Sequence, residues 1–225
     1  MSDEMKKYFL SLREIEKVGT DYYIFNFEMP EDIQFTEGQY GVFMHVDKQI
    51  EGRKVRAFSV ASSNKEDVFK IATKIVETPS DFKAKMLELK PGDQMTFDGP
   101  MGSFTLEKNY HVVLIAGGIG ITPIRSLVKQ IEAIKLHKAV ELVYSEPRKI
   151  YPFQDEFDHL DFLDKHYANT VENTRENIAN VTKKYLNSAY YYISGSPSFV
   201  NAIAEQIREY GIETSNIKFD RFNGY

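Results

Sequence analysis

The first half of the chain alternates short segments rich in aromatic and β-branched residues with turns that contain Gly, Pro or Asp. Such segments are typical of strands, and we expect them at residues 8–12, 22–27, 40–46, 55–60, 68–76 and 95–97. One helix interrupts them, because Ser80 and Asp81 can cap a helix whose apolar positions Phe82, Met86 and Leu87 follow at helical spacing. Six strands at this spacing predict a small antiparallel β-barrel.

The second half has a different pattern. Residues 111–116 form a continuous apolar run, which is typical of a parallel strand buried on both faces. A glycine turn follows, and then an amphipathic helix marked by Ile124, Leu127, Val128, Ile131 and Ile134. Further strands are expected at residues 140–144, at 190–193 and near Phe219, with a helix over 199–210. This alternation predicts a doubly wound α/β domain at 107–225, after a barrel domain at 1–106.

Composition narrows the chemistry. The 225 residues include no cysteine, which excludes disulfides, cysteine-ligated zinc and the usual cysteine-held iron–sulfur clusters. The five histidines lack metal-ligand spacing, so we predict no metal site and expect any redox chemistry to use a bound organic cofactor. The net charge of −5 argues against a nucleic-acid partner. Without a signal peptide or a long apolar run, we expect a cytoplasmic protein with no membrane partner.

Two glycine turns are the candidate nucleotide site. A strand that ends in glycines and opens a helix lets backbone N–H groups approach a phosphate. The first turn contains Gly117, Gly118, Gly120, Ile121, Thr122 and Pro123, and the second contains Gly195, Ser196 and Pro197. Both follow predicted parallel strands, whose carboxyl ends are where open sheets bind ligands. Either turn alone could be a tight turn without a ligand, but the pair favours a nucleotide cleft.

A second candidate site lies on a strand of the barrel. Arg56 can pair with a phosphate, and Phe58, two residues on, would lie on the same face and could cover a flat ring. Taken alone, the pair is a weak signal, because most arginines and phenylalanines in strands are solvated or core residues.

The ordered set of motifs resembles the ferredoxin–NADP reductase superfamily. The resemblance rests on eight segments in family order: residues 56–62 (RAFSVAS), 78–80 (TPS), 90–93 (KPGD), 99–104 (GPMGSF), 117–123 (GGIGITP), 144–145 (YS), 195–197 (GSP) and a tail 222–225 (FNGY). It implies a flavin barrel, a nicotinamide-nucleotide domain, and hydride transfer between NAD(P)H and FAD. It also implies that electrons pass to a ferredoxin- or flavodoxin-type carrier.

The resemblance also implies roles for individual residues. The FAD-binding set would be Arg56, Ala57, Phe58, Ser59, Ala72, Thr73, Lys74, Thr78, Pro79, Ser80, Phe222 and Tyr225. Arg56 would bind a flavin phosphate, Phe58 would cover the ring, and Ser59 would hydrogen-bond the atom that receives hydride. Ser59, Ser194 and Asp220 are the implied catalytic residues. Phe58, Ser194 and Ser196 stand where the family more often has Tyr, Cys and Pro.

The choice of nucleotide and acceptor stays open. Ser145 and Arg148 could hold the 2′-phosphate of NADPH, whereas Glu146 could accept the 2′-hydroxyl of NADH. We predict NADP, with NAD as the alternative. Other acceptors are a free flavin, a ferric complex or a quinone, and a third reading is a non-enzymatic flavin-binding component of a larger electron-transfer complex. The cluster Lys48, Arg53 and Lys54 is either solvated surface or a docking patch for an acidic carrier.

Overall fold

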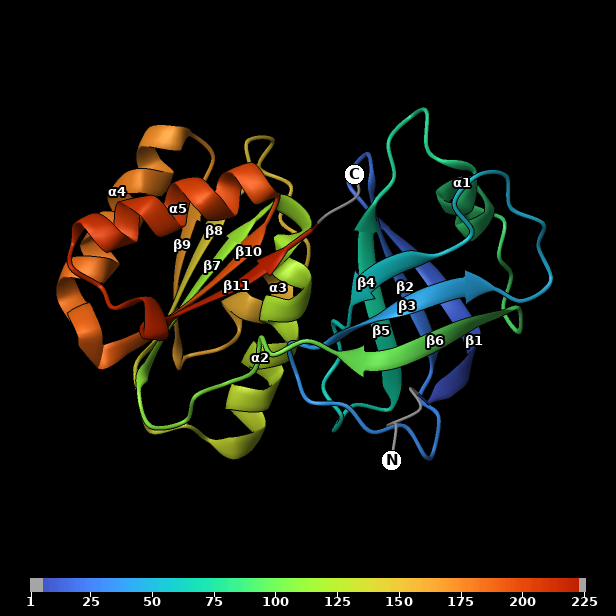
Figure 1. Cartoon of the computed structure of the whole chain (residues 1–225), viewed down its shortest axis with the longest axis horizontal. Coiled ribbons are helices and arrows are strands. Elements are labelled where there is room, and N and C mark those ends of the chain that lie inside the picture. The colour runs from blue at the N-terminus through green and yellow to red at the C-terminus, as the bar shows by residue number, and fades with distance from the viewer. Residues whose placement is uncertain (1–5, 223–225) are drawn as a thin grey trace. The chain divides into compact units, whose positions relative to one another are not determined.

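The computed structural model describes residues 6–222 and divides into two compact units (Figure 1). The first unit contains Met1–Thr105 together with Arg125–Ala133, and the second contains Leu106–Ile124 and Ile134–Tyr225. The sequence pattern did not indicate that Arg125–Ala133, a part of the second half, groups with the barrel. The domain boundary after residue 106 stays a prediction.

In the first unit, six strands of the described residues form one antiparallel sheet in the order β4-β3-β6-β1-β2-β5. They are β1 (Lys7–Val18), β2 (Tyr22–Glu28), β3 (Tyr40–His45), β4 (Arg56–Ser59), β5 (Val68–Lys74) and β6 (Gln94–Met101). An antiparallel bridge between Val60 and Ile71 joins the two edge strands β4 and β5 and closes the sheet. Helix α1 (Asp81–Leu87) lies between β5 and β6 in the chain. The predicted six-stranded antiparallel barrel is confirmed.

Strand β1 is longer than the sequence pattern predicted. Its first residues pair with β6, and after a register shift between Leu12 and Glu14 the strand continues beside β2 to Val18. A bulge of this kind bends a strand and increases its twist, so that one strand can serve two neighbours in a barrel. The second part was missed because most of its side chains are exposed and charged.

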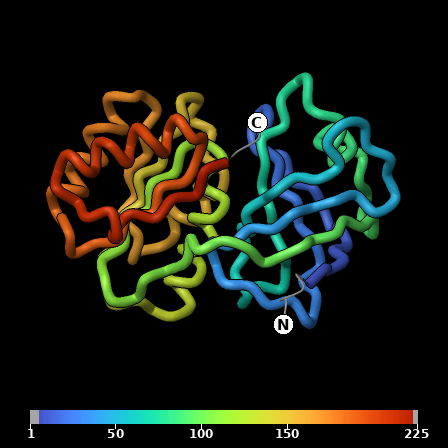
Figure 2. The backbone as a smooth tube through the Cα atoms, viewed as in Figure 1, coloured from blue at the N-terminus to red at the C-terminus, as the bar shows by residue number. Residues whose placement is uncertain are grey.

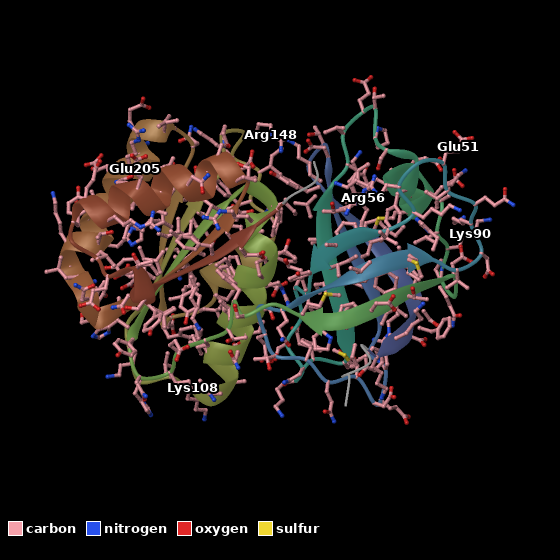
Figure 3. All side chains as sticks on the ribbon, in the orientation of Figure 1. Glu51, Arg56, Lys90, Lys108, Arg148 and Glu205 are labelled. Carbon is pink, nitrogen blue, oxygen red and sulfur yellow. The ribbon has the colours of Figure 1, made fainter. Side chains whose placement is uncertain are left out.

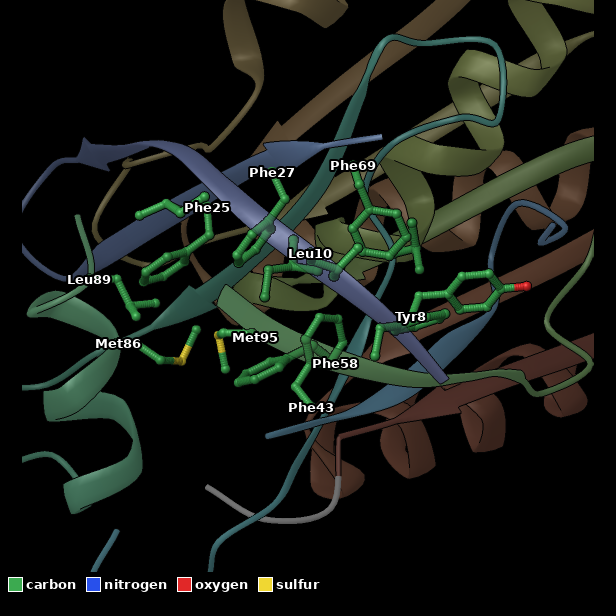
Figure 4. Packing of buried hydrophobic residues seen from close by; sticks show 14 of the residues in the cluster. Tyr8, Leu10, Phe25, Phe27, Phe43, Phe58, Phe69, Met86, Leu89 and Met95 are labelled. Carbon is green, nitrogen blue, oxygen red and sulfur yellow. The ribbon is translucent and has the colours of Figure 1, made fainter. Parts of the chain in front are cut away.

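The barrel core is mostly aromatic (Figure 4). Phe43, Phe69 and Phe97 are fully buried, and Phe97 meets the other two edge-on with ring centroids 5.3 and 5.1 Å apart. Edge-to-face pairs of this kind are the favoured arrangement of aromatic rings. Helix α1 contributes Phe82 and Met86 to the same core, at the helical spacing that the sequence shows.

The second unit contains, within residues 6–222, a parallel sheet of five strands in the order β11-β10-β7-β8-β9 (Figure 2). Its strands are β7 (His111–Gly117), β8 (Val140–Ser145), β9 (Leu163–Ala168), β10 (Ala189–Gly195) and β11 (Ile217–Arg221). Its helices are α2 (Ile121–Ile134), α3 (Gln154–Asp158), α4 (Val171–Tyr185) and α5 (Pro197–Glu209), with 3₁₀ turns at Gly118–Gly120, Leu186–Ser188 and Thr214–Asn216.

Helices cover both faces of this sheet. α4 and α5 share one apolar cluster with residues of β7, β8, β10 and β11. α3 and the first turn of α2 lie on the opposite face (Figure 1). The predicted doubly wound parallel-sheet domain is therefore confirmed.

The sequence pattern missed β9 and α4. β9 is an edge strand in which Asp164, Lys165 and His166 interrupt the apolar run. Part of its stability comes from Glu141 on β8, which is only 1% exposed. The Glu141 carboxylate lies 2.7 Å from each of three groups: His166 Nε2, the Lys184 ammonium and the Tyr185 hydroxyl. This network joins β8 to β9 and to the end of α4.

Candidate functional site

The flavin signature lies on β4 and at its end, where the barrel closes. Arg56 is partly exposed (Figure 3), and its guanidinium donates to the carbonyls of Arg53 and Val55 at 3.0 and 2.9 Å. The same guanidinium lies 5.5 Å from the ring centre of Phe82 on α1. Backbone carbonyls and a ring face orient the arginine without neutralising it, so its positive charge remains for an anion.

Lys83 is a candidate residue that sequence reasoning missed. Its ammonium donates to the carbonyl of Lys74 at 2.8 Å. The pKa of Lys83 is lowered to about 8, first by burial and then by the positive charges of Arg56 and Lys74. Arg56 at the start of β4 and Lys74 at the end of β5, both predicted to contact the flavin, therefore lie close enough to Lys83 to disfavour its protonated form. The sequence held one signal, because a lysine in the first turn of a helix opposes the helix dipole.

This cation cluster, formed by Arg56, Lys74 and Lys83, fits a phosphate-bearing cofactor. The charges of Arg56 and Lys74 lower the pKa of Lys83, and an anion that binds among the three would offset this repulsion. Next along the chain, Thr78 and Ser80 are exposed where α1 begins. Ser80 holds the N-cap position, but its side chain makes no capping hydrogen bond within the described part of the chain. Its hydroxyl therefore stays available to a ligand.

An open hollow of about 500 Å³ lies beside Thr78 and Ser80. Its wall combines apolar and polar side chains, namely Thr20, Asp21, Tyr23, Ile75, Val76, Glu77, Pro79 and Leu87. Two of the apolar members, Val76 and Leu87, are 50% and 39% exposed.

Phe58 and Ser59 are both buried. Phe58 is 8% exposed and packs against Phe43, with ring centroids 5.4 Å apart, and against Phe82 at 6.3 Å (Figure 4). The ring therefore belongs to the barrel core, and its predicted contact with a flavin stays a prediction. Ser59 is 6% exposed and lies next to the bridge between Val60 and Ile71.

Residues 72–74 of β5 complete this region. The bridge that closes the barrel places the end of β4 beside β5, so that Ser59 and Ala72 are the next residues outward from the bridge on their two strands. Ala72 and Thr73 are buried and Lys74 is half-buried. Ala57, by contrast, is exposed.

The two glycine turns of the second unit touch each other. A Cβ added to Gly120 would lie 2.2 Å from the carbonyl oxygen of Ser194, so only glycine fits there. Gly195 has a φ of +153°, and a Cβ on it would meet the carbonyl of Gly117 at 3.2 Å. The turns meet between β7 and β10, where the strand order reverses direction. Open parallel sheets bind ligands at such a switch point.

The side chains after the first turn face inward. Ile121, Thr122 and Pro123 are buried, and the Thr122 hydroxyl donates to the carbonyl of Ile119 at 2.8 Å. Only backbone groups of this turn can therefore reach a ligand. In the second turn, Ser196 caps α5 by accepting from the N–H of Phe199 at 3.2 Å, and Pro197 occupies the first helical turn.

Ser194 carries a buried hydroxyl that lacks a protein partner. The residue is 0% exposed, and its Oγ makes no hydrogen bond to any residue in the described range. Buried polar groups are almost always satisfied, so this hydroxyl is a candidate partner for a ligand group or a water. In the sheet register Ser194 lies beside Asp220, which is half-buried. The N–H of Phe222 donates to the carbonyl of Gly195 at 3.0 Å, while Tyr225 lies outside the described residues.

Arg148, which the sequence linked to NADPH, and Glu146, which it linked to NADH, contact each other (Figure 3 shows Arg148). Glu146 is 3% exposed, and its Oε1 accepts from both the Nε and the backbone N–H of Arg148 at 3.1 Å. Ser145 Oγ lies 2.8 Å from Thr174 Oγ1. The guanidinium charge is thus partly neutralised before any nucleotide binds.

Within residues 6–222, no helix is long and apolar enough to cross a membrane. In the same range, no three His, Asp or Glu side chains gather where they could hold a metal ion.

Comparison with known proteins supports a flavoprotein. Residues 10–106 match the family model of the oxidoreductase FAD-binding domain. Among curated proteins, the chain is 27% identical over 229 residues to a component of the Na(+)-translocating NADH-quinone reductase of Idiomarina loihiensis, covering 88% of this chain and 56% of the relative. It is also 27% identical over 187 residues to flavohemoprotein A of Dictyostelium discoideum, covering 75% and 47%. The chain therefore spans about half the length of these relatives.

Solved structures share the whole fold. The ferredoxin reductase in carbazole 1,9a-dioxygenase superposes with a TM-score of 0.82 at 22% identity, covering 96% of this chain and 67% of that one. The ferredoxin NADP+ reductase of Neisseria gonorrhoeae with bound FAD and NADP gives a TM-score of 0.80 at 17% identity, covering 96% and 98%. Residues 10–106 thus match an oxidoreductase FAD-binding domain, and the chain as a whole shares the fold of these reductases.

Proposed function

We propose that the chain transfers hydride between a nicotinamide nucleotide and FAD and delivers the electrons to a ferredoxin- or flavodoxin-type carrier. The observation that carries the proposal is the buried, unpartnered hydroxyl of Ser194 at the meeting point of the two glycine turns. The cation cluster of the barrel supports it independently. When bound, FAD accepts hydride and releases electrons singly or in pairs.

The chain's own residues position the two cofactors. Arg56 and Lys83 would hold the FAD phosphates, with the hydroxyls of Thr78 and Ser80 as further donors. Ser59, Phe58 and residues 72–74 would fix the flavin ring. In the second unit, backbone N–H groups of the first glycine turn would hold the nucleotide phosphates. Ser194 would supply the polar contact at the nicotinamide, with Asp220 beside it.

The test uses the purified full chain. We expect a yellow protein that contains FAD, and anaerobic addition of NADH or NADPH should bleach its absorption near 450 nm. Ser194→Ala should keep the FAD and slow the bleaching, and Ser198→Ala, an exposed serine nearby, is the matched control. A protein that does not bind FAD, or that neither nucleotide bleaches, would refute the proposal.

A second candidate acceptor is a quinone, and the names of the relatives favour it. Several curated relatives are components of a Na(+)-translocating NADH-quinone reductase. Reduction of a ferredoxin, a flavodoxin, a soluble quinone, free flavin and a ferric complex can be compared at one NADH concentration. A protein carrier as the best acceptor supports our proposal, whereas a preference for quinone supports the second candidate. Bleaching without transfer to any of them would support an electron-transfer component of a larger complex.

The structure also bears on the nucleotide. Glu146 is buried and already accepts a hydrogen bond from the Arg148 guanidinium. A 2′-phosphate that bound to Arg148 would therefore also lie close to the Glu146 carboxylate. We therefore propose NADH as the preferred donor, although the sequence alone favoured NADPH. Glu146→Gln should improve the NADPH:NADH ratio of kcat/KM roughly tenfold or more, equivalent to about 1.4 kcal/mol. A wild type that already prefers NADPH would contradict this assignment. The predicted cytoplasmic location stays a prediction.

A further inference from the structure

Helix α2 belongs to both units. It runs unbroken from Ile121 to Ile134, yet residues 121–124 group with the nucleotide unit and Arg125–Ala133 with the barrel. Its first residue directly follows the 3₁₀ turn Gly118–Gly120, which contains the proposed phosphate contacts. A continuous helix moves as a stiff rod over this length, because every backbone hydrogen bond along it resists bending.

Arg125 is the first residue of the part that groups with the barrel. It is 2% exposed, and its two terminal nitrogens donate to the two carboxylate oxygens of Glu66 at 2.8 and 2.9 Å. Nη1 also donates to the carbonyl of Ala61 at 2.8 Å. Burial would raise the pKa of Glu66, but the hydrogen bonds and charge of Arg125 outweigh it and lower that pKa. The pair is therefore ionised at neutral pH.

Ser126, the next residue of α2, also hydrogen-bonds to the barrel. The Ser126 hydroxyl donates to the carbonyl of Ser62 at 2.9 Å and accepts from the N–H of Gly38 at 3.3 Å. Glu66 in turn accepts from the N–H of Ser63 at 2.7 Å. Consecutive helix residues thus hold consecutive backbone carbonyls of one barrel segment.

That segment, residues 61–66, directly continues the strand of the flavin signature. Ala61 lies two residues after Ser59, and its N–H donates to the carbonyl of Lys70 at 2.7 Å, next to the bridge that closes the barrel. A displacement of the Ala61 carbonyl would therefore move the backbone at Ser59. Packing alone does not require an ion pair here, since apolar residues of similar volume often stabilise a buried site as well. What the bidentate pair adds is a fixed position and direction.

We propose that Arg125 is a positioning residue that couples nucleotide binding at Gly118–Gly120 to the flavin-contacting segment at Ser59. The inference rests on the proposed function, because it needs a flavin at Ser59 and a nucleotide at the turn. A nucleotide that pulls on the start of α2 shifts Arg125, and the shift reaches Ala61 through a single hydrogen bond. Lysine at this position keeps the charge but cannot contact the two oxygens of Glu66 and the Ala61 carbonyl in the same geometry.

The experiment measures amide hydrogen exchange in the FAD-loaded full chain, with and without saturating oxidised nucleotide. In the wild type, nucleotide should change the exchange of the peptide that covers residues 59–66 at least threefold. Arg125→Lys and Glu66→Gln should lose most of this change while nucleotide affinity stays within threefold. The rate constant of flavin reduction at saturating NADH should fall tenfold or more with little change in KM.

Asp67→Asn is the matched control. Asp67 follows Glu66 directly and forms an exposed pair with Arg13 at 3.6 Å. It should behave as the wild type in every measurement. If Arg125→Lys fails to fold, Glu66→Gln carries the test alone, because it keeps the size of the side chain but removes the charge and one of the two oxygens that hold the guanidinium in place against the Ala61 carbonyl.

Two outcomes overturn the inference, and a third result identifies a failure of the proposed function. The inference is wrong if nucleotide does not alter exchange at residues 59–66 in the wild type. It is also wrong if the Lys and Gln variants respond like the wild type. A wild type that binds no FAD or no nucleotide overturns the proposed function itself, and the binding titrations that precede the exchange experiment reveal it.

Discussion

The lowered pKa of Lys83 predicts that FAD binding depends on pH. In the FAD-free protein this pKa is about 8, because burial and the charges of Arg56 and Lys74 disfavour the ammonium form. A bound phosphate supplies negative charge, and we expect it to return the pKa to the ordinary lysine range. Binding above pH 8 then requires uptake of a proton, so FAD affinity falls as the pH rises.

The size of the effect follows from the two pKa values. With a free pKa of about 8, only about 3% of Lys83 is protonated at pH 9.5, against about 90% at pH 7. If the bound form stays protonated, the FAD dissociation constant rises about 30-fold between these pH values, equivalent to about 2 kcal/mol. Below pH 7 the dependence from this group should disappear.

Titration of the FAD-free protein with FAD, followed by quenching of flavin fluorescence, measures the dissociation constant at each pH. Lys83→Arg should flatten the curve, because a guanidinium stays charged throughout this range. Lys83→Met should flatten it at a weaker affinity. Lys85→Met is the matched control, since Lys85 lies on the same helix and pairs with Glu88 at 2.8 Å. A wild-type affinity that is constant from pH 7 to 9.5 would refute the reasoning.

Three other substitutions test separate parts of the molecule. Arg56→Ala should weaken FAD binding roughly 10- to 100-fold by loss of a charge-assisted hydrogen bond, whereas Arg53→Ala should not. Gly120→Ala should abolish nucleotide binding measured by calorimetry, with FAD content retained, because its Cβ would meet Ser194. Glu141→Gln should lower the free energy of unfolding at pH 7 by about 3 kcal/mol in denaturant titrations. Unchanged values would contradict each assignment.

The contribution of Glu141 to the free energy of unfolding should depend on pH, and acid titration tests its sign. Burial would raise the pKa of this carboxyl, but the hydrogen bonds from His166, Lys184 and Tyr185 outweigh it and hold the pKa at about 2. Because the folded pKa lies below the unfolded one, the stabilisation is complete above about pH 4.5 and is lost as the pH falls toward 2. The difference in the free energy of unfolding between the wild type and Glu141→Gln should therefore shrink as the pH falls from about 4.5 toward 2.

The sequence predicted those elements whose buried positions follow from the local pattern of apolar and polar residues. The apolar run before Gly117 and the alternating aromatic segments of the barrel needed only local periodicity. β9 needed more, because its charged residues are tolerated only where Glu141 on the neighbouring strand binds His166. Periodicity along one strand contains no information about a partner on the next.

The candidate site divides in the same way. The glycine turns and Arg56 are visible as motifs, and the structure brings the two turns together. Lys83 and Arg125 were missed because their roles depend on groups distant in sequence: Arg56 for one, Glu66 and Ala61 for the other. Each nevertheless breaks a local rule, since Lys83 opposes a helix dipole and Arg125 is a charge within a buried apolar stretch.

The orphaned hydroxyl of Ser194 bears on what a serine at this strand end could contribute to ligand binding. A buried hydroxyl without a partner costs about 1–3 kcal/mol, and alanine would avoid that cost. The backbone cannot relieve it, because Gly120 already presses against the Ser194 carbonyl and fixes the strand end. A polar group of a bound nucleotide can relieve it, which converts a local instability of the free protein into affinity for the ligand. On this reasoning we expect Ser194 to act as a recognition group that gives a small polar contact at the position where the proposed hydride transfer occurs.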